Sequence, residues 1–206
     1  MEVYLTFIVA LIFSYLGSIP PGMINISVLQ YALQSRKDAA LSFIVACVLV
    51  EFVYALIAVR FQIFITENTA FNEYFQLITA TVLIGLGLVN LFRRKQERKV
   101  LDFGEKRNAF KRGTLISLGN TLAIPFWLAV TTYLQSLGWI SLENFGFWAF
   151  IFGIALGTFL LLITILFLAS RYSIVLNNHF LVYKAPGFLF LFMGGWSFYQ
   201  WIITLG

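Results

Sequence analysis

Six apolar runs, each long enough to cross a membrane, account for most of the sequence. They cover residues 4–33, 39–60, 74–93, 112–135, 145–170 and 185–205. A helix of about 20 apolar residues crosses the hydrocarbon core of a bilayer. No water is present there to satisfy backbone groups, so runs of this kind form helices. The sequence therefore predicts an all-α integral membrane protein, with one polytopic domain over residues 1–206 and six transmembrane helices.

Composition supports this class and excludes another. The chain is 60% hydrophobic and 11% charged, whereas soluble domains carry about 25% charged residues. The net charge of +5 does not indicate nucleic-acid binding, because the basic residues lie in short blocks between apolar runs and no soluble basic domain carries them. The first run lacks a basic segment before it and a small-residue cleavage site, so we expect it to be retained as a span.

The distribution of basic residues predicts the orientation of the chain. Thirteen of the 14 Lys and Arg residues lie in the first, third and fifth loops, and Arg60 is the exception. The positive-inside rule places these three loops in the cytoplasm and both termini outside it. The longest of them, residues 94–111, is a basic loop that we expect to lie against anionic lipid.

That loop divides the six spans into two sets of three, with repeat 1 at about residues 1–93 and repeat 2 at about residues 112–206. Because three is odd, the second set enters the membrane in the opposite orientation. The sequence thus predicts an inverted 3+3 repeat.

Two of the apolar runs contain a break. In the stretch from Ser18 to Asn25, the residues Pro20, Pro21 and Gly22 cannot continue a regular helix. The second break is the polar stretch Gly119–Pro125 in the fourth run. Broken backbone at membrane depth survives only where it is buried in protein or lines a watery cavity. Interrupted helices at corresponding positions of two halves point to a transport site.

Glu51 is the only ionisable side chain well inside a span. An acid there costs roughly 2.5–3.5 kcal/mol on insertion scales and suggests a functional site. It can bind a substrate ammonium group, or take up a proton as substrate leaves. The alternative is a structural acid held by a neighbour such as Asn25, Asn120 or Tyr54.

Asn25 and Asn120 lie beside the two breaks, and each side chain offers two donors and an acceptor. They can restore freed backbone hydrogen bonds or contact a zwitterionic substrate. The exposed N–H groups of a half-helix favour a substrate carboxylate, so we expect substrate contact. The predicted substrate-binding and transport residues are Pro20, Pro21, Gly22, Asn25, Glu51, Asn120 and Pro125.

Other chemistry has little support in the sequence. Cys47 and Glu51 are the strong metal ligands inside the spans, and a metal site needs several of suitable type. There is no catalytic triad and no nucleotide-binding loop, so nothing predicts an enzyme, a metal or a cofactor, and transport must draw on a gradient or a partner. The Gly153-x-x-x-Gly157 motif favours close helix packing inside the protein over a dimer interface. A homodimer remains an alternative use of this motif.

The segment Pro21-Gly22-Met23-Ile24-Asn25 resembles the Pro-Gly-Pro-x-Asn motif of the lysine exporter (LysE-type) amino-acid efflux translocators. The stretch from Gly113 to Asn120 is similar to one that ends in that family's Asn-Pro, and Glu51 falls close to where some members carry an acid. The resemblance implies a secondary transporter in the bacterial inner membrane that exports amino acids or related small zwitterionic metabolites by proton exchange.

The chain departs from the family pattern in two places. Met23 replaces the second proline of the first motif, and Thr121 replaces the proline after Asn120, with Pro125 four residues later. A shift of that size moves a helix break by about one turn, roughly 5.4 Å, so we expect the second half of the site to be remodelled. Two alternatives stay open: a metal-ion exporter on the same scaffold, and a non-transporting membrane assembly factor.

Overall fold

The computed structural model describes residues 2–19, 22–67, 69–92, 108–120, 122–169 and 184–205, and these ranges contain helices and no strand. The helices follow the six predicted runs in order, with the first and fourth runs each forming two helices. They are α1 (Glu2–Gly17), α2 (Met23–Leu33), α3 (Lys37–Glu67), α4 (Thr69–Phe92), α5 (Ala109–Leu118), α6 (Ala123–Ser136), α7 (Phe145–Phe167) and α9 (Ala185–Leu205).

The prediction of an all-α membrane protein is confirmed. Helices α3 and α7 are each long and apolar enough to cross a membrane, and α5 with α6 forms a third candidate span that bends by 63°. The apolar parts of the other described helices are shorter. Length and composition therefore support two crossings, or three if the bent pair α5–α6 forms one span.

Some helix boundaries differ from the prediction. Helix α3 continues to Glu67 rather than ending near residue 60, so Arg60 lies within it. Helix α5 begins at Ala109, and the last residues of the predicted basic loop therefore form its first turn. The rest of that loop, residues 94–107, lies outside the described residues.

Both predicted breaks are present. Helix α1 ends at Gly17 and α2 begins at Met23 after Gly22, whose backbone is extended. Helix α5 ends at Leu118 and α6 begins at Ala123.

Pro20, Pro21 and Thr121 lie outside the described residues. Pro125 is the third residue of α6, a position whose N–H would have no intrahelical partner in any case. Pro125 therefore sits in the first turn of a helix instead of interrupting one.

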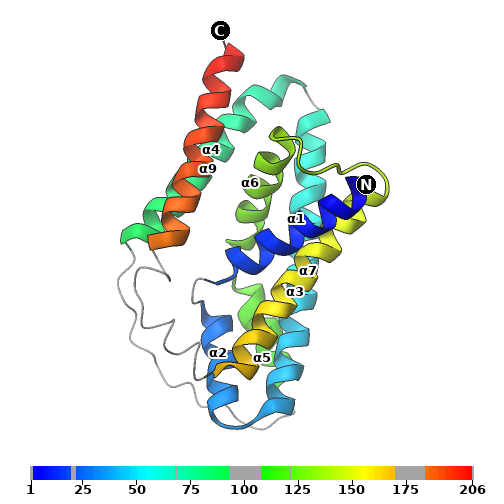
Figure 1. Cartoon of the computed structure of the whole chain (residues 1–206), viewed down its shortest axis with the longest axis vertical. Helices are drawn as coiled ribbons and strands as arrows, with labels where there is room; N and C mark the ends of the chain where they lie inside the picture. Colours follow the sequence, from blue (N-terminus) through cyan, green and yellow to red (C-terminus); the bar gives the residue numbers. More distant parts are fainter. Residues whose placement is uncertain are drawn as a thin grey trace.

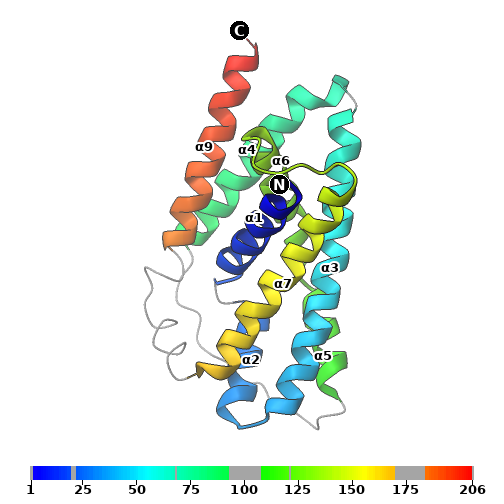
Figure 2. The ribbon, with the colours of Figure 1, turned by 45° about the vertical axis from the view of Figure 1, so that its right-hand side comes forward.

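Each broken helix packs along the middle helix of the other half of the chain. Helices α1 and α2 contact α7, whereas α5 and α6 contact α3, and α4 pairs with α9. Figures 1 and 2 show α3 and α7 crossing the molecule in opposite directions, with the α2–α3 turn at the lower end and both chain termini in the upper half. The α4–α9 pair stands at one side of this bundle.

Glycines permit the closest of these contacts. A Cβ atom added to Gly153 of α7 would lie 2.6 Å from the Phe7 carbonyl oxygen of α1, and one on Gly113 of α5 would lie 2.6 Å from the Phe43 carbonyl oxygen of α3. The expectation that the Gly153-x-x-x-Gly157 motif packs inside the protein is confirmed, because both of its glycines face α1.

Candidate functional site

Glu51 lies midway along α3 and is held by a residue that sequence reasoning did not name. Its Oε1 atom accepts a hydrogen bond of 2.5 Å from the indole Nε1–H of Trp127, the fifth residue of α6. Trp127 is 1% exposed. A buried indole N–H usually needs an acceptor, so this bond satisfies both side chains. A neighbouring side chain does hold Glu51, but it is Trp127 and not one of the three expected neighbours, Asn25, Asn120 or Tyr54.

Tyr54 instead forms a hydrogen bond with the end of α5, on the other side of the second break from Trp127. Its hydroxyl donates to the carbonyl oxygen of Leu118, at 2.7 Å. Leu118 is the last residue of α5, and carbonyls at a helix end have no partner within the helix. Since residues three apart share a helix face, Glu51 and Tyr54 present one face of α3 to both sides of the break. We call Glu51, Tyr54, Trp127 and the Leu118 carbonyl the central site.

The first break is bridged by a hydrogen bond from the side chain of Asn25. The Nδ2 atom of Asn25 donates to the carbonyl oxygen of Ser18 at 2.7 Å, and Ser18 directly follows α1. Asn25 is 5% exposed. Of the two roles considered for this residue, restoring a freed backbone hydrogen bond is the one present in this structure.

The last residue of α1, Gly17, is connected to the central site through the ring of Phe126. A Cβ atom on Gly17, the last residue of α1, would lie 2.8 Å from the ring of Phe126. That ring stands edge-on to the indole of Trp127, with 4.9 Å between centroids. A continuous line of contacts therefore runs from the first break through Phe126 and Trp127 to Glu51.

Two of the predicted site residues, Asn120 and Gly22, take no part in the side-chain hydrogen bonds described above. Asn120 is exposed in the α5–α6 connection, where its N–H donates to the Ser117 carbonyl and its own carbonyl accepts from Ala123 N–H. No hydrogen bond joins its side chain to Glu51 in the described part of the chain. A Cβ atom on Gly22 would meet no atom of the described residues within 4 Å, so these residues leave the space beside this glycine open.

An apolar hollow of about 80 Å³ lies beside the central site, between α1, α6 and α9. Its lining residues are Phe13, Leu16, Gly17, Phe126, Val130, Leu189, Phe190 and Met193. None of these side chains is polar. The hollow therefore offers space to an apolar group next to the aromatic rings that lead to Glu51.

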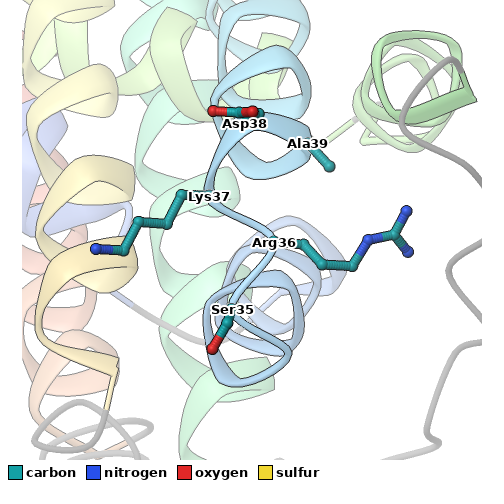
Figure 3. Close-up of a pocket in the computed structure, with 5 residues that line it drawn as sticks. All are labelled: Ser35, Arg36, Lys37, Asp38 and Ala39. Carbon is teal, nitrogen blue, oxygen red and sulfur yellow. The ribbon is translucent and has the colours of Figure 1, made fainter.

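A second, more open hollow of about 310 Å³ lies at the α2–α3 turn and is lined by Ser35, Arg36, Lys37, Asp38 and Ala39. Figure 3 shows the Arg36 and Lys37 side chains extending to opposite sides of this turn. Lys37 begins α3, and Glu51 lies about 20 Å further along that helix at 1.5 Å per residue. This hollow is therefore separate from the central site. The described residues contain no group of three or more side chains suited to holding a metal ion.

The long apolar helices, the two breaks and the intramembrane acid that holds one of them define a multi-pass membrane protein with the features of a small-molecule transporter. The chain belongs to the LysE type translocator family, whose model matches residues 15–200. No curated protein and no solved structure matches the chain significantly. The family resemblance predicted from the first break and the Gly113–Asn120 stretch is confirmed, and it places the protein in a family of translocators.

Proposed function

We propose that this protein is a secondary transporter that exports amino acids or related small zwitterionic metabolites across the bacterial inner membrane in exchange for protons. The observation that carries the proposal is the Glu51–Trp127 hydrogen bond. It joins Glu51, the acid midway along α3, to the helix that begins immediately after a break. Intramembrane acids of this kind mark substrate and proton pathways.

In this mechanism Glu51 binds the substrate ammonium group and the proton in turn. A substrate ammonium group competes with the Trp127 N–H for the Glu51 carboxylate and loosens the hold of α3 on α6. When the substrate leaves, a proton neutralises the carboxylate in its place. The charge of the site is therefore balanced in each direction of transport, which couples efflux of the zwitterion to entry of a proton.

The breaks supply the groups for the substrate carboxylate. N–H groups at the start of a half-helix favour an anion, and α2 and α6 both begin at breaks. Asn25 and Asn120 contact the substrate in this proposal. Asn25 must then release the Ser18 carbonyl, whereas the exposed Asn120 is already accessible. Gly22 leaves open space at the first break, and Pro20, Pro21 and Pro125 fix the backbone around the two sites.

The proposal includes six crossings in an inverted 3+3 repeat. Its support is reciprocal packing: the broken helix of each half lies along the middle helix of the other, and the third helices, α4 and α9, pair with each other. The opposite directions of α3 and α7 in Figure 1 agree with it. A rocking motion of one half against the other would then open the central site to alternate sides.

We place the α2–α3 turn in the cytoplasm and both termini outside it, because Arg36 and Lys37 line the turn and basic loops remain inside. The basic loop of residues 94–111 then lies against anionic lipid on the same side.

Efflux from proteoliposomes tests the function. Vesicles loaded with a mixed amino-acid pool are followed with and without an imposed pH gradient, and protein-free vesicles serve as the control. Gradient-dependent loss of a subset of amino acids is the expected result. If folded protein releases none of them, the exporter proposal fails, and metal export or membrane assembly becomes the better hypothesis.

A further inference from the structure

We infer that the substrate carries a small aliphatic side chain, which is accepted by the apolar hollow between α1, α6 and α9. This inference rests on the proposed function and specifies its substrate class. It predicts that branched aliphatic amino acids are exported in preference to basic ones.

The chemistry of the hollow excludes a charged side chain. It is bounded by Phe13 and Gly17 of α1, Phe126 and Val130 of α6, and Phe190 and Met193 of α9. Val130 and Met193 are each 1% exposed. A lysine or arginine side chain placed there would lose its hydration with no acid among the described lining residues to pair with, which is strongly unfavourable. An aliphatic group loses nothing by the same transfer and gains apolar contact.

The position of the hollow connects it to Glu51 through one ring. Phe126 stands edge-on to Trp127, with centroids 4.9 Å apart, and also edge-on to Phe190, with centroids 5.6 Å apart. Trp127 in turn donates to Glu51. In this inference the zwitterion binds Glu51 through its ammonium group and directs its side chain past Trp127 at Phe126, and displacement of that ring opens the way into the hollow.

The size of the hollow sets an upper limit on the side chain. An engineered apolar cavity of about 150 Å³ binds benzene, and this hollow of about 80 Å³ is smaller. It suits the side chain of valine, leucine or isoleucine, and an aromatic side chain exceeds it. Leu16 and Leu189 line the hollow and are 48% and 40% exposed. This exposure also gives a lipid acyl chain a route in, which makes lipid the competing occupant.

The test is efflux of labelled leucine, alanine, phenylalanine and lysine, each from separately loaded proteoliposomes under the same pH gradient. We expect kcat/KM for leucine to exceed that for lysine by at least about tenfold, since one methylene in an apolar pocket already changes specificity by that factor. Phenylalanine should also be transported less well than leucine.

Variants of Val130 link this preference to the hollow. Val130→Ile fills part of it and should lower kcat/KM for leucine by about tenfold while changing that for alanine less than twofold. Val130→Ala enlarges the hollow and should raise phenylalanine relative to leucine. The matched control is Val59→Ile, which makes the same change at a fully buried position of α3 outside the hollow. Ratios between substrates are measured on one protein sample, so a lower yield of folded variant does not affect them.

Three results would overturn the inference. Efflux of lysine as fast as leucine contradicts the substrate class and leaves the transporter function intact. A leucine-to-alanine ratio that Val130→Ile and Val59→Ile change equally shows that the hollow holds lipid or nothing. Absence of any amino-acid efflux removes the proposed function, and the inference with it.

Discussion

The Glu51 carboxylate on α3 accepts a hydrogen bond from the Trp127 indole on α6, 76 residues further along the chain. One turn away, Tyr54 binds the end of α5. The two side chains therefore hold the two segments of the broken fourth helix against a continuous one. Because a hydrogen bond to an ionised carboxylate is stronger than one to a neutral carboxyl group, we expect protonation of Glu51 to weaken its hold on α6.

Glu51→Gln should abolish coupling to the pH gradient while preserving the fold. The amide oxygen of glutamine can still accept from the Trp127 N–H, but the side chain can neither release nor take up a proton. Efflux should then become independent of an imposed pH gradient. The control is Glu143→Gln, which removes an exposed acid before α7. Undiminished pH-dependent efflux from the Glu51 variant would rule out its role in coupling.

Trp127→Phe should destabilise the protein by about 1–2 kcal/mol, at the upper end of values for side-chain hydrogen bonds between membrane helices. The substitution keeps an aromatic ring but leaves a Glu51 oxygen without its donor. Thermal or denaturant unfolding in detergent measures the effect. Trp148→Phe, at a 45% exposed position of α7, provides the comparison.

A double variant separates the hydrogen bond from packing. If the bond is the source of the loss, Trp127→Phe should cost less when Glu51 is already leucine than in the unmodified protein. Equal costs in both backgrounds, or a cost no larger than that of Trp148→Phe, would mean that Glu51 gains nothing from the indole.

The two asparagines at the breaks should behave differently. Asn25→Ala removes the buried bond to the Ser18 carbonyl and should cost about 1–2 kcal/mol in unfolding free energy. Asn120→Ala, at an exposed position, should leave stability nearly unchanged and weaken substrate selectivity. Unfolding and the ratio of efflux rates between amino acids are measured on both variants. Equal destabilisation by the two substitutions would favour a structural role for Asn120 as well.

The sequence was sufficient for the helices and the breaks, because both depend on local properties. Apolar length predicts a span wherever it falls, and two consecutive prolines followed by Gly22 in the middle of such a run cannot continue a regular helix. Glu51 was likewise identifiable from its solitary charge. Its hydrogen-bond partner, Trp127, could not be identified in the same way, because pairing depends on which helices become neighbours in space. One signal was present: Trp127 carries a donor inside an apolar run, and Glu51 was the one intramembrane acid available to accept it.

Pro125 is a case in which the sequence suggested a feature that the structure does not have at that residue. Its presence in an apolar run suggested that it forms part of the second break, but the break precedes it and α6 begins two residues earlier. Proline is tolerated in a first helical turn as readily as it ends a helix, and only the start of the hydrogen-bond ladder distinguishes the two cases. The apolar hollow could not be predicted either, since three helices from different parts of the chain contribute to it.

Glycine substitutions test the reciprocal packing on which the inverted repeat depends. A Cβ atom on Gly113 or Gly153 would lie 2.6 Å from a backbone oxygen of the facing helix, and backbone cannot turn aside as a side chain can. Gly113→Ala and Gly153→Ala should therefore force α5 from α3 and α1 from α7, at about 1–3 kcal/mol each. An added Cβ on Gly85 of α4 would meet no atom within 4 Å in the described part of the chain, so Gly85→Ala should be neutral or stabilise the helix by up to about 1 kcal/mol. Unfolding of the three variants under one condition decides the matter. If Gly113 and Gly153 tolerate alanine as well as Gly85 does, the two broken helices are not in backbone contact with the middle helices of the opposite halves, and the repeat loses its main structural support.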